Sequence, residues 1–385
     1  MTEAVVRVNG TVAPGFEPVR AAFEANFERW AEVGAACCVY LDGRPVVDLW
    51  GGVTAPGSER PYTDRTLQLV ASATKGAMAI CAHRLAERGE LDLDAAVSSY
   101  WPEFGAAGKE RLPVRWLFTH QAGLPAVDPV IPMPQVYRWT PMVEALAAQR
   151  PYWEPGTAHG YHAMTYGWLT GEVLARITGL TPGEVLAREV ADPLGIDFFV
   201  GLPDEELDRV APLIPAPAPP PGAGPDPLTV LLADRDGLAH KAFFVPNGLF
   251  PAINDPDLLR AQLPAVNGVA TARALARMYA ACLGEVDGVR LLRPETLAAA
   301  TVPQTSGPDR VAPYASRFGV GFQLSFPERP MAGEGSFGHY GLGGSVGFAH
   351  PGLGLAFGYT VNQMRPGGVP DPRSMALIGA VLDCR

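Results

Sequence analysis

The stretch LQLVASATKGAMAICAHRLAERG at residues 67–89 joins a short apolar run to a helix-like repeat. Apolar side chains recur at helical spacing over residues 73–88, and Gly89 stands where helices commonly end. Ser72 and Lys75 fall at the start of this helix, and the S-x-x-K spacing places both side chains on one face. The stretch therefore predicts a strand, a tight turn and a helix that presents a serine beside a lysine.

The pair of Ser72 and Lys75 suits nucleophilic catalysis. A serine hydroxyl is a weak nucleophile until a base takes its proton, and a lysine buried beside it loses solvation, so that its pKa falls toward neutrality. Arginine cannot act in this way because its guanidinium stays protonated. The chain has 27 arginines and only three lysines, so a lysine at this position is informative. The alternative is that Ser72 only caps the helix and Lys75 is a solvated first-turn residue.

The rest of the chain alternates between helical and strand-like patterns. An amphipathic helix is expected over residues 16–33, followed by two β-rich runs that Asp42-Gly43 joins into a hairpin. The middle is mostly helical and loop, and strand-like runs rich in glycine and aromatic residues return near the end. We therefore expect an α+β fold: an antiparallel β-sheet flanked by helices, built from the N- and C-terminal segments, with an inserted, mostly helical lobe.

Domain boundaries follow from the same pattern. Residues 1–90 and 290–385 are expected to form the sheet domain, and residues 91–289 the helical domain. Eight prolines crowd residues 211–227, which we interpret as a long surface loop rather than an interdomain linker. A cleft between two such lobes is a usual place for an active site.

Composition narrows the classes of protein and partner. Of the 385 residues, 48% are apolar and 18% charged, which excludes an intrinsically disordered chain. The net charge is −10 and no basic cluster occurs, so no nucleic-acid partner is expected. No apolar run reaches membrane-spanning length and no secretory signal is recognised, so we expect no membrane partner and a cytoplasmic location. The spacing of cysteines and histidines predicts no disulfide scaffold and no metal site, and no cofactor is expected.

A second motif is Tyr161-His162-Ala163, in a glycine-rich turn just before an expected helix. Together with the S-x-x-K pair, it resembles the serine β-lactamase and penicillin-binding-protein superfamily. The segments GELDLDAAVSSYWPEF, VRWLFTHQAGLP and GVATARALARMYAACL are similar to it too, so that the resemblance covers roughly residues 16–365. It is strongest to the class C β-lactamase-like branch, which includes family VIII carboxylesterases, DD-peptidases and some acyltransferases.

The resemblance implies a catalytic group of Ser72, Lys75 and Tyr161, in which the tyrosine moves a proton between nucleophile, leaving group and water. For this role the pKa of the phenol must fall, and the ammonium of Lys75 is the expected cause. Ala163 stands where β-lactamases and peptidases have an asparagine that binds the substrate amide, so amide recognition is weakened. His162 is the candidate that would compensate.

A third motif, His339-Tyr340-Gly341, occupies the place of the superfamily's K-T-G triad on a strand that lines the cleft. A histidine is mostly neutral at pH 7 and gives no permanent charge for a substrate carboxylate, which favours neutral esters. Gly341 would let the strand approach the substrate. By resemblance, the backbone amides of Ser72 and Leu342 would form the oxyanion hole. The expected substrate-binding residues are His339, Gly341, His162 and Ala163.

The same segment contains a competing motif, since GGSVG at residues 343–347 matches the G-x-S-x-G of α/β-hydrolases. That motif needs a strand before its serine, a helix after it, and an acid and a histidine further on. A strand-like pattern follows Ser345, and only His350 lies beyond it. We therefore interpret Ser345 as a strand or turn residue.

Four functions are compatible with these motifs. The leading hypothesis is a serine esterase that cleaves small-molecule carboxylic esters through an acyl-enzyme on Ser72. An acyltransferase would pass the same acyl group to an amine or alcohol in secondary metabolism. A β-lactamase or DD-peptidase is disfavoured by Ala163 and His339. A non-enzymatic binding protein would be expected to have lost one of Ser72, Lys75 and Tyr161. The motifs give no oligomeric state.

Overall fold

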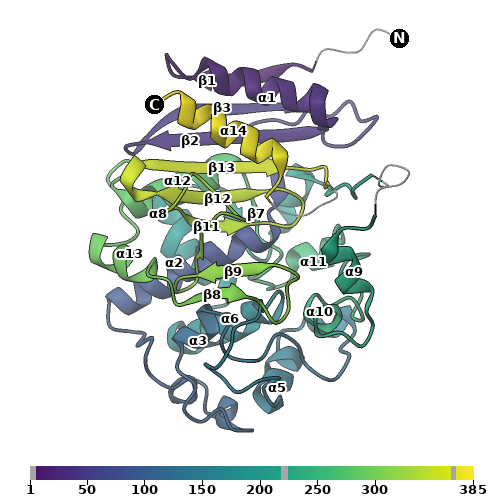
Figure 1. The fold of residues 1–385 in the computed structure, drawn as a ribbon, viewed down its shortest axis with the longest axis vertical. Helices are drawn as coiled ribbons and strands as arrows, with labels where there is room; N and C mark the ends of the chain where they lie inside the picture. Colours follow the sequence, from purple (N-terminus) through teal and green to yellow (C-terminus); the bar gives the residue numbers. More distant parts are fainter. Residues whose placement is uncertain (1–5, 218–223, 366–369) are drawn as a thin grey trace.

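A nine-stranded antiparallel sheet forms the upper part of the structure (Figure 1). The computed structural model describes residues 6–217, 224–365 and 370–385. The strand order is β1-β3-β2-β13-β12-β11-β10-β9-β8, so strands from both ends of the chain are neighbours. The expectation of an antiparallel α+β sheet is confirmed. The strands are β1 (Val8–Val12), β2 (Gly34–Leu41), β3 (Arg44–Gly52), β8 (Thr305–Pro308), β9 (Ala315–Phe318), β10 (Gln323–Leu324), β11 (Phe337–Tyr340), β12 (Val346–His350) and β13 (Leu355–Val361).

The hairpin between β2 and β3 closes at the expected dipeptide. Asp42 and Gly43 have φ angles of 47° and 76°, as a tight two-residue hairpin turn requires. On its other edge β2 pairs along its length with β13. This pairing makes one sheet out of segments that lie almost the whole chain apart.

Helices cover both faces of this sheet. On one face α1 (Glu17–Trp30) and α14 (Pro372–Asp383) lie side by side, and on the other α12 (Ala272–Leu283) packs against β2, β12 and β13 (Figure 1). Helix α1 buries Val19 and Phe23 at the helical spacing that the sequence predicts. Each such fully buried side chain stabilises the fold by about 1.5–3 kcal/mol.

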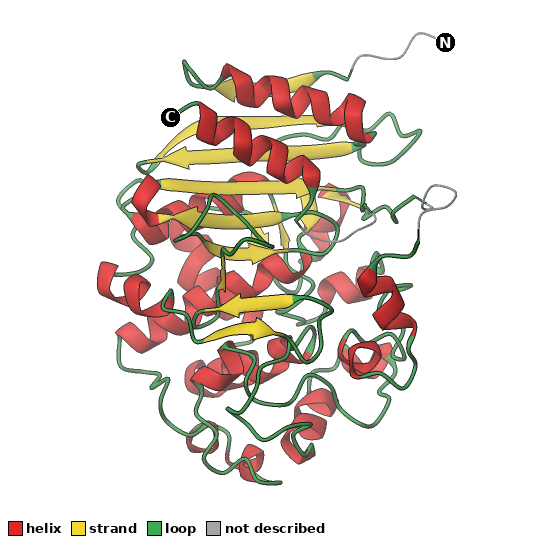
Figure 2. Ribbon diagram, viewed as in Figure 1, coloured by secondary structure: helices red, strands yellow, loops and turns green. Residues whose placement is uncertain are grey.

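The lower part of the structure is mostly helical and loop (Figure 2). A small four-stranded sheet, ordered β5-β7-β4-β6, links this part to the large sheet. Its strands are β4 (Leu67–Leu69), β5 (Phe198–Phe199), β6 (Val210–Ala211) and β7 (Val269–Ala270). The remaining helices are α2 (Thr74–Glu87), α3 (Arg115–Phe118), α4 (Met133–Val136), α5 (Thr140–Ala148), α6 (Thr165–Thr178), α7 (Pro182–Leu186), α8 (Asp192–Leu194), α9 (Pro227–Ala233), α10 (Leu238–Ala242), α11 (Pro256–Arg260) and α13 (Pro294–Ala300).

The division into domains at residues 1–90, 91–289 and 290–385 stays a prediction. Helix α12 lies inside the middle segment by sequence, yet it packs on the large sheet. Its contacts favour a boundary nearer to residue 270. Of the proline-rich stretch 211–227, residues 218–223 lie outside the described residues.

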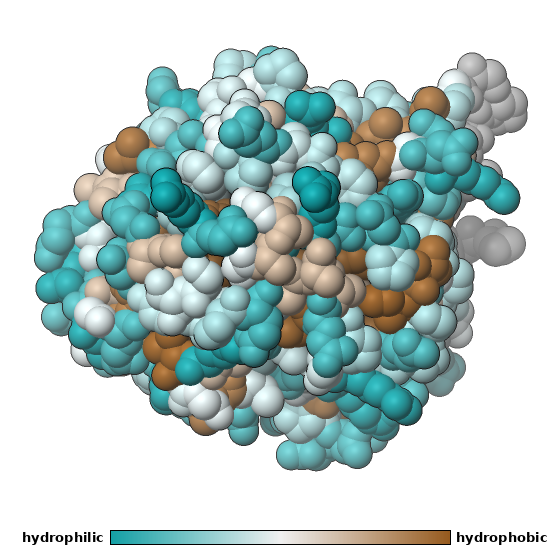
Figure 3. All heavy atoms as spheres, turned by 90° about the horizontal axis from the view of Figure 1, so that it is seen from below, coloured by the Kyte–Doolittle hydropathy of each residue, from teal (hydrophilic) through white to brown (hydrophobic). Residues whose placement is uncertain are grey.

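The surface at the helical end mixes polar and apolar residues. Seen from below in Figure 3, brown apolar groups are scattered among teal hydrophilic ones. Among the helices of the described ranges, none combines the length and the hydropathy that crossing a bilayer requires.

Candidate active site

Ser72 sits in a single turn of 3₁₀ helix, Ala71–Ala73, between strand β4 and helix α2. The preceding Ala71 has a φ of 47°, a conformation that costs energy for a residue with a side chain. The hydroxyl of Thr74 donates to the Ala71 carbonyl at 2.6 Å and accepts the amide of Gly268 at 3.1 Å. These bonds hold the strained turn in place and fix the direction of the Ser72 side chain.

Lys75 is fully buried beneath Ser72, one helical turn further on. Its Nζ lies 3.1 Å from Ser72 Oγ and donates to the carbonyl oxygens of Ala163 at 2.8 Å and Ala265 at 2.9 Å. Burial holds the pKa of Lys75 well below its usual value, as the sequence predicts. The reading of Lys75 as a solvated first-turn residue is therefore wrong.

The contacts of Lys75 match the valence of a neutral amine. Such an amine has two N–H donors and one lone pair, and two carbonyls take the two donors. In that form the lone pair is left to accept the Ser72 O–H, whereas the ammonium form donates a third hydrogen bond to Ser72 Oγ. This geometry places the Lys75 amine against a single hydroxyl, that of Ser72.

Tyr161 completes the cluster. The centre of the Tyr161 ring lies 4.9 Å from Lys75 Nζ. The backbone amide of Tyr161 donates to Asp309 Oδ1 at 2.9 Å. Burial raises the pKa of Tyr161, although the Ser72 hydroxyl opposes the rise. The sequence led us to expect the opposite direction. The reason is that burial of the ring itself outweighs the groups that lower the pKa of the phenol.

Strand β11 supplies the opposite wall. A Cβ on Gly341 would lie 2.2 Å from the carbonyl oxygen of Val70, so only glycine lets the end of β11 approach the turn that carries Ser72. The glycine thus makes room for that turn, where the sequence analysis expected it to make room for the substrate. Gly341 donates its own amide to the Ser345 carbonyl at 2.7 Å. The next residue, Leu342, lines the same cavity as Ser72.

Comparison with known proteins shows the family to which the chain belongs. A family model described as Beta-lactamase matches residues 19–380. The chain belongs to the β-lactamase family. It is 38% identical, over 93% of its own length and 83% of the relative's, to "Esterase/beta-lactamase LipL" of Mycobacterium tuberculosis (strain ATCC 25618 / H37Rv).

Solved structures of this β-lactamase-family fold are similar along almost the whole chain. The crystal structure of a family VIII carboxylesterase has a TM-score of 0.89 and 37% identity, and covers 98% of this chain and 100% of its own. EstA from Arthrobacter nitroguajacolicus Rue61a has a TM-score of 0.85 and 35% identity, and covers 98% of both chains. The resemblance stated from the motifs is therefore confirmed.

His339 lines the cavity of this β-lactamase-family protein as a neutral side chain. Its Nδ1–H donates to the carbonyl of Tyr340 at 2.6 Å, and its buried Nε2 has no hydrogen-bond partner among the described residues. Burial holds the pKa of His339 at about 3, and the charge of Arg329 acts in the same direction. A lone pair, rather than a charge, therefore faces the cavity at this position.

His162 and Ala163 lie behind the wall of the cavity. His162 donates from Nδ1 to the carbonyl of Gly160 at 2.7 Å and accepts the amide of Leu124 at Nε2 at 2.9 Å, so both ring nitrogens are occupied. Ala163 is buried and acts through its carbonyl, which accepts from Lys75. The contacts of both residues are structural: they hold the turn of Tyr161 and orient Lys75.

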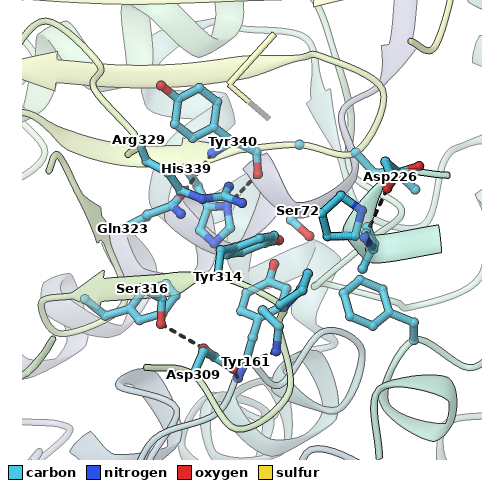
Figure 4. Close-up of a pocket in the computed structure, with 18 of the residues that line it drawn as sticks. Ser72, Tyr161, Asp226, Asp309, Tyr314, Ser316, Gln323, Arg329, His339 and Tyr340 are labelled. Carbon is cyan, nitrogen blue, oxygen red and sulfur yellow. Dashed lines mark hydrogen bonds between the residues drawn. The ribbon is translucent and has the colours of Figure 1, made fainter. Parts of the chain in front are cut away.

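The cavity itself has a volume of about 170 Å³ and opens above Ser72 (Figure 4). Its wall combines apolar rings with a few polar groups, as small-molecule sites do. The lining residues are Ser72, Tyr161, Asp226, Pro227, Leu228, Phe243, Asp309, Ala312, Pro313, Tyr314, Ser316, Phe318, Gln323, Arg329, His339, Tyr340, Gly341, Leu342 and Gly343. Of the residues expected from the sequence to form the site, His162 and Ala163 are absent from this wall, and Lys75 lies beneath it.

Sequence reasoning missed the residues of β9, β10 and the segments around them. Phe318 stacks on Tyr161 with ring planes 5° apart, and Arg329, Gln323 and Tyr314 line the cavity. None of them belongs to a motif with a fixed spacing from Ser72. Phe318 and Gln323 carry only the pattern of their strands, which does not say which face meets Ser72, and Tyr314 and Arg329 lie outside the strands.

Proposed function

We propose that the chain hydrolyses carboxylic esters of small molecules through an acyl-enzyme formed on Ser72. The observation that carries this proposal is the buried Lys75 amine, 3.1 Å from Ser72 Oγ, with its other contacts taken by two carbonyls. Two of the similar proteins are described as an esterase/beta-lactamase and a family VIII carboxylesterase, which supports ester hydrolysis by this chain.

Acylation begins when Lys75 removes the hydroxyl proton of Ser72 and Oγ attacks the ester carbonyl carbon. The negative charge that develops on the carbonyl oxygen would be held by the backbone amides of Ser72 and Leu342. Both residues line one cavity, and the close approach at Gly341 brings their chain segments together. This arrangement supports the assignment of the oxyanion hole to these two amides.

Tyr161 would act as the proton carrier of the reaction. Because its pKa is raised by burial, the phenol keeps its proton in the resting site and can give it to the leaving alcohol. Lys75, protonated after acylation, then lies 4.9 Å from the ring and lowers the cost of a phenolate. A water molecule that loses a proton to this phenolate would attack the acyl carbon; the bond to Ser72 Oγ then breaks, Lys75 returns its proton to Oγ, and the acid is released.

Intact-mass analysis tests the proposal directly. Incubation with a short-chain p-nitrophenyl ester should add the mass of the acyl group to the wild-type protein and release p-nitrophenol. The Ser72→Ala variant should gain no mass, whereas Ser345→Ala should behave as the wild type. An acyl adduct on Ser72→Ala, or no turnover of any ester by the wild type, would show that the proposal is wrong.

The same experiment separates hydrolysis from acyl transfer. An added amine or alcohol should not change the yield of free acid if water is the normal acceptor. Conversion of most of the acyl group into an amide or a new ester would instead identify an acyltransferase.

A further inference from the structure

The cavity contains one charged side chain whose hydrogen-bonding groups are unused by the protein. Arg329 is 4% exposed and lies with its guanidinium carbon 3.7 Å from the centre of the Tyr314 ring. In the described ranges no carboxylate pairs with it, and its side chain donates no hydrogen bond to protein. Figure 4 shows the guanidinium above Tyr314, on the same side of the cavity as His339 and Gln323.

The two acidic side chains on the cavity wall, Asp309 and Asp226, form no ion pair with Arg329. Asp309 accepts three backbone amides and the hydroxyl of Ser316. Asp226 caps helix α9 and accepts the amides of Leu228 and Thr229. Both carboxylates are therefore held by their own loops, and Arg329 is the charge that faces the cavity without a partner among the described residues.

Gln323 adds a second open donor. Its Oε1 accepts the amide of Tyr340 at 3.3 Å, which fixes the orientation of the side-chain amide and leaves the Nε2 end for another group. His339 remains neutral, so it contributes no second cation. The charge of Arg329 nevertheless acts on Tyr161. It lowers the pKa of the phenol and so opposes the rise that burial causes.

We propose that Arg329, with Gln323, forms an anion subsite of the active site, and that the preferred substrates are esters that also carry a carboxylate. The proposal rests on the proposed ester hydrolysis and names its substrate class. A guanidinium held flat against an aromatic ring presents its edge in a fixed direction, and carboxylates match that edge with two parallel hydrogen bonds. His339 gives no permanent cation, which favoured neutral esters; Arg329 supplies a cation from the segment between β10 and β11.

The reaction keeps its ordinary balance with such a substrate. With p-nitrophenyl hemiglutarate, Ser72 Oγ bonds to the ester carbonyl carbon and the bond to p-nitrophenolate breaks. Water then adds its OH to the acyl carbon, the bond to Ser72 Oγ breaks and Oγ takes up a proton, which gives glutarate and free Ser72. The distal carboxylate takes no part in bond making and only pairs with Arg329.

The test compares charged and neutral esters of equal size. p-Nitrophenyl hemiglutarate and its neutral 4-carbamoylbutanoate analogue place the charge on the acyl side, and 4-acetoxybenzoate and 4-acetoxybenzamide place it on the alcohol side. In at least one pair, the wild type should prefer the charged ester in kcat/KM by about tenfold or more, as expected for charge-assisted hydrogen bonds. Arg329→Gln should bring that ratio close to one, and Arg329→Lys should keep part of it.

Arg310 provides the matched control. It too is an arginine stacked on an aromatic ring, 5.6 Å from the centre of Trp153, but it is exposed and does not line the cavity. Arg310→Gln makes the same change in charge and should keep the wild-type ratio. Equal loss of the ratio in both variants would point to long-range electrostatics and contradict an anion subsite.

A measurement on the wild type guards against a variant that fails to fold. Glutarate should inhibit hydrolysis of a neutral p-nitrophenyl ester competitively and at least about tenfold more strongly than glutaramide does. Equal inhibition, or no preference in either ester pair, overturns the anion subsite while ester hydrolysis stands. Failure to hydrolyse neutral and charged esters alike would instead overturn the proposed function.

Discussion

Lys75 and Arg373 are both fully buried cationic side chains near a serine, and their surroundings are opposite. Lys75 meets two carbonyls and the Ser72 hydroxyl, and burial lowers its pKa. Burial also disfavours the charge of Arg373, but Asp371 at 2.7 Å and Glu32 at 3.6 Å are among the groups that raise its pKa. Of these two buried basic groups, the one without an acid beside it is disfavoured as a cation, whereas the one with acids is held as part of an ion pair.

The serines near these cations differ in the same way. Ser72 opens toward the cavity from a 3₁₀ turn. Ser345 is buried just before strand β12, in the segment whose Gly343 carbonyl accepts from Arg373 at 3.3 Å. The strand context expected for Ser345 is confirmed, so its G-x-S-x-G match has no helix behind it.

The largest expected effect is the difference in activity between the alanine variants of the two serines. Ser72→Ala should lower kcat/KM for a p-nitrophenyl ester by on the order of 10⁴-fold or more, because the nucleophile is lost. Ser345→Ala should keep most of the activity, since only a buried hydroxyl outside the cavity is removed. Steady-state kinetics on both variants would decide, and an inactive Ser345→Ala with an active Ser72→Ala would contradict the whole comparison.

The second prediction concerns the kind of cation beside Ser72. Lys75→Arg keeps a positive charge but has no deprotonated form, so it should lose about 10²–10⁴-fold in kcat/KM, nearly as much as Lys75→Met. In the wild type, kcat/KM should fall tenfold for each pH unit below the lowered pKa of Lys75, because only the neutral amine is a base.

Lys109 is the control for this pair of variants. It too is buried, donates to two carbonyls, of Ala147 at 3.0 Å and Gln149 at 2.7 Å, and has a pKa lowered by burial to about 8. Its two carbonyl partners lie outside the three motifs of the site, so Lys109→Met should leave the acid limb of the pH profile unchanged. A Lys75→Arg variant with near wild-type activity would show that Lys75 serves only as a fixed charge.

The free energy of unfolding should depend more on Arg373 than on Lys75, the reverse of the order expected for activity. Arg373→Met leaves two buried acids without their cation and should lower the free energy of unfolding by about 3–5 kcal/mol. Lys75→Met should cost less, because it loses two hydrogen bonds to carbonyls but also removes the price of desolvating an amine. Urea denaturation of both variants would measure the difference, and a Lys75→Met variant as unstable as Arg373→Met would contradict it.

The smallest effect is a pH dependence that belongs only to the Arg373 region. Burial raises the pKa of Glu32 to about 7, although Arg373 and Tyr359 oppose the rise. The folded protein therefore binds more protons than the unfolded chain between the ordinary carboxyl pKa and pH 7. Its stability from this group is complete below that window and is lost as pH rises through about 7, by up to about 3 kcal/mol. Unfolding of Glu32→Gln should show a weaker loss over the same range, and an unchanged slope would exclude this titration.

Much of the fold can be predicted from local patterns, because they record local physics. The positions of Val19 and Phe23, the Asp42-Gly43 turn and the helix after Ser72 all follow from spacing or backbone conformation. The same holds for the pairing of a serine with a lysine on one helical face.

The degree to which a side chain is buried and its contacts with distant segments could not be predicted in this way. The direction of the Tyr161 pKa depends on how fully the ring is buried. The place of Arg329 in the cavity depends on how the segment after β10 folds over the site. The structural role of the His162 ring depends on a local carbonyl, that of Gly160, and on the amide of Leu124 from a distant segment. None of these relations has a period in the sequence.

The pairing of β2 with β13 has a consequence for the order of folding during synthesis. The N-terminal hairpin leaves the ribosome early, but the strand that completes its inner edge is translated only after almost the whole chain. Until then the apolar faces of β2 and β3 and an unpaired strand edge are open to other chains. The nascent protein should therefore depend on a holding chaperone until β13 has left the ribosome.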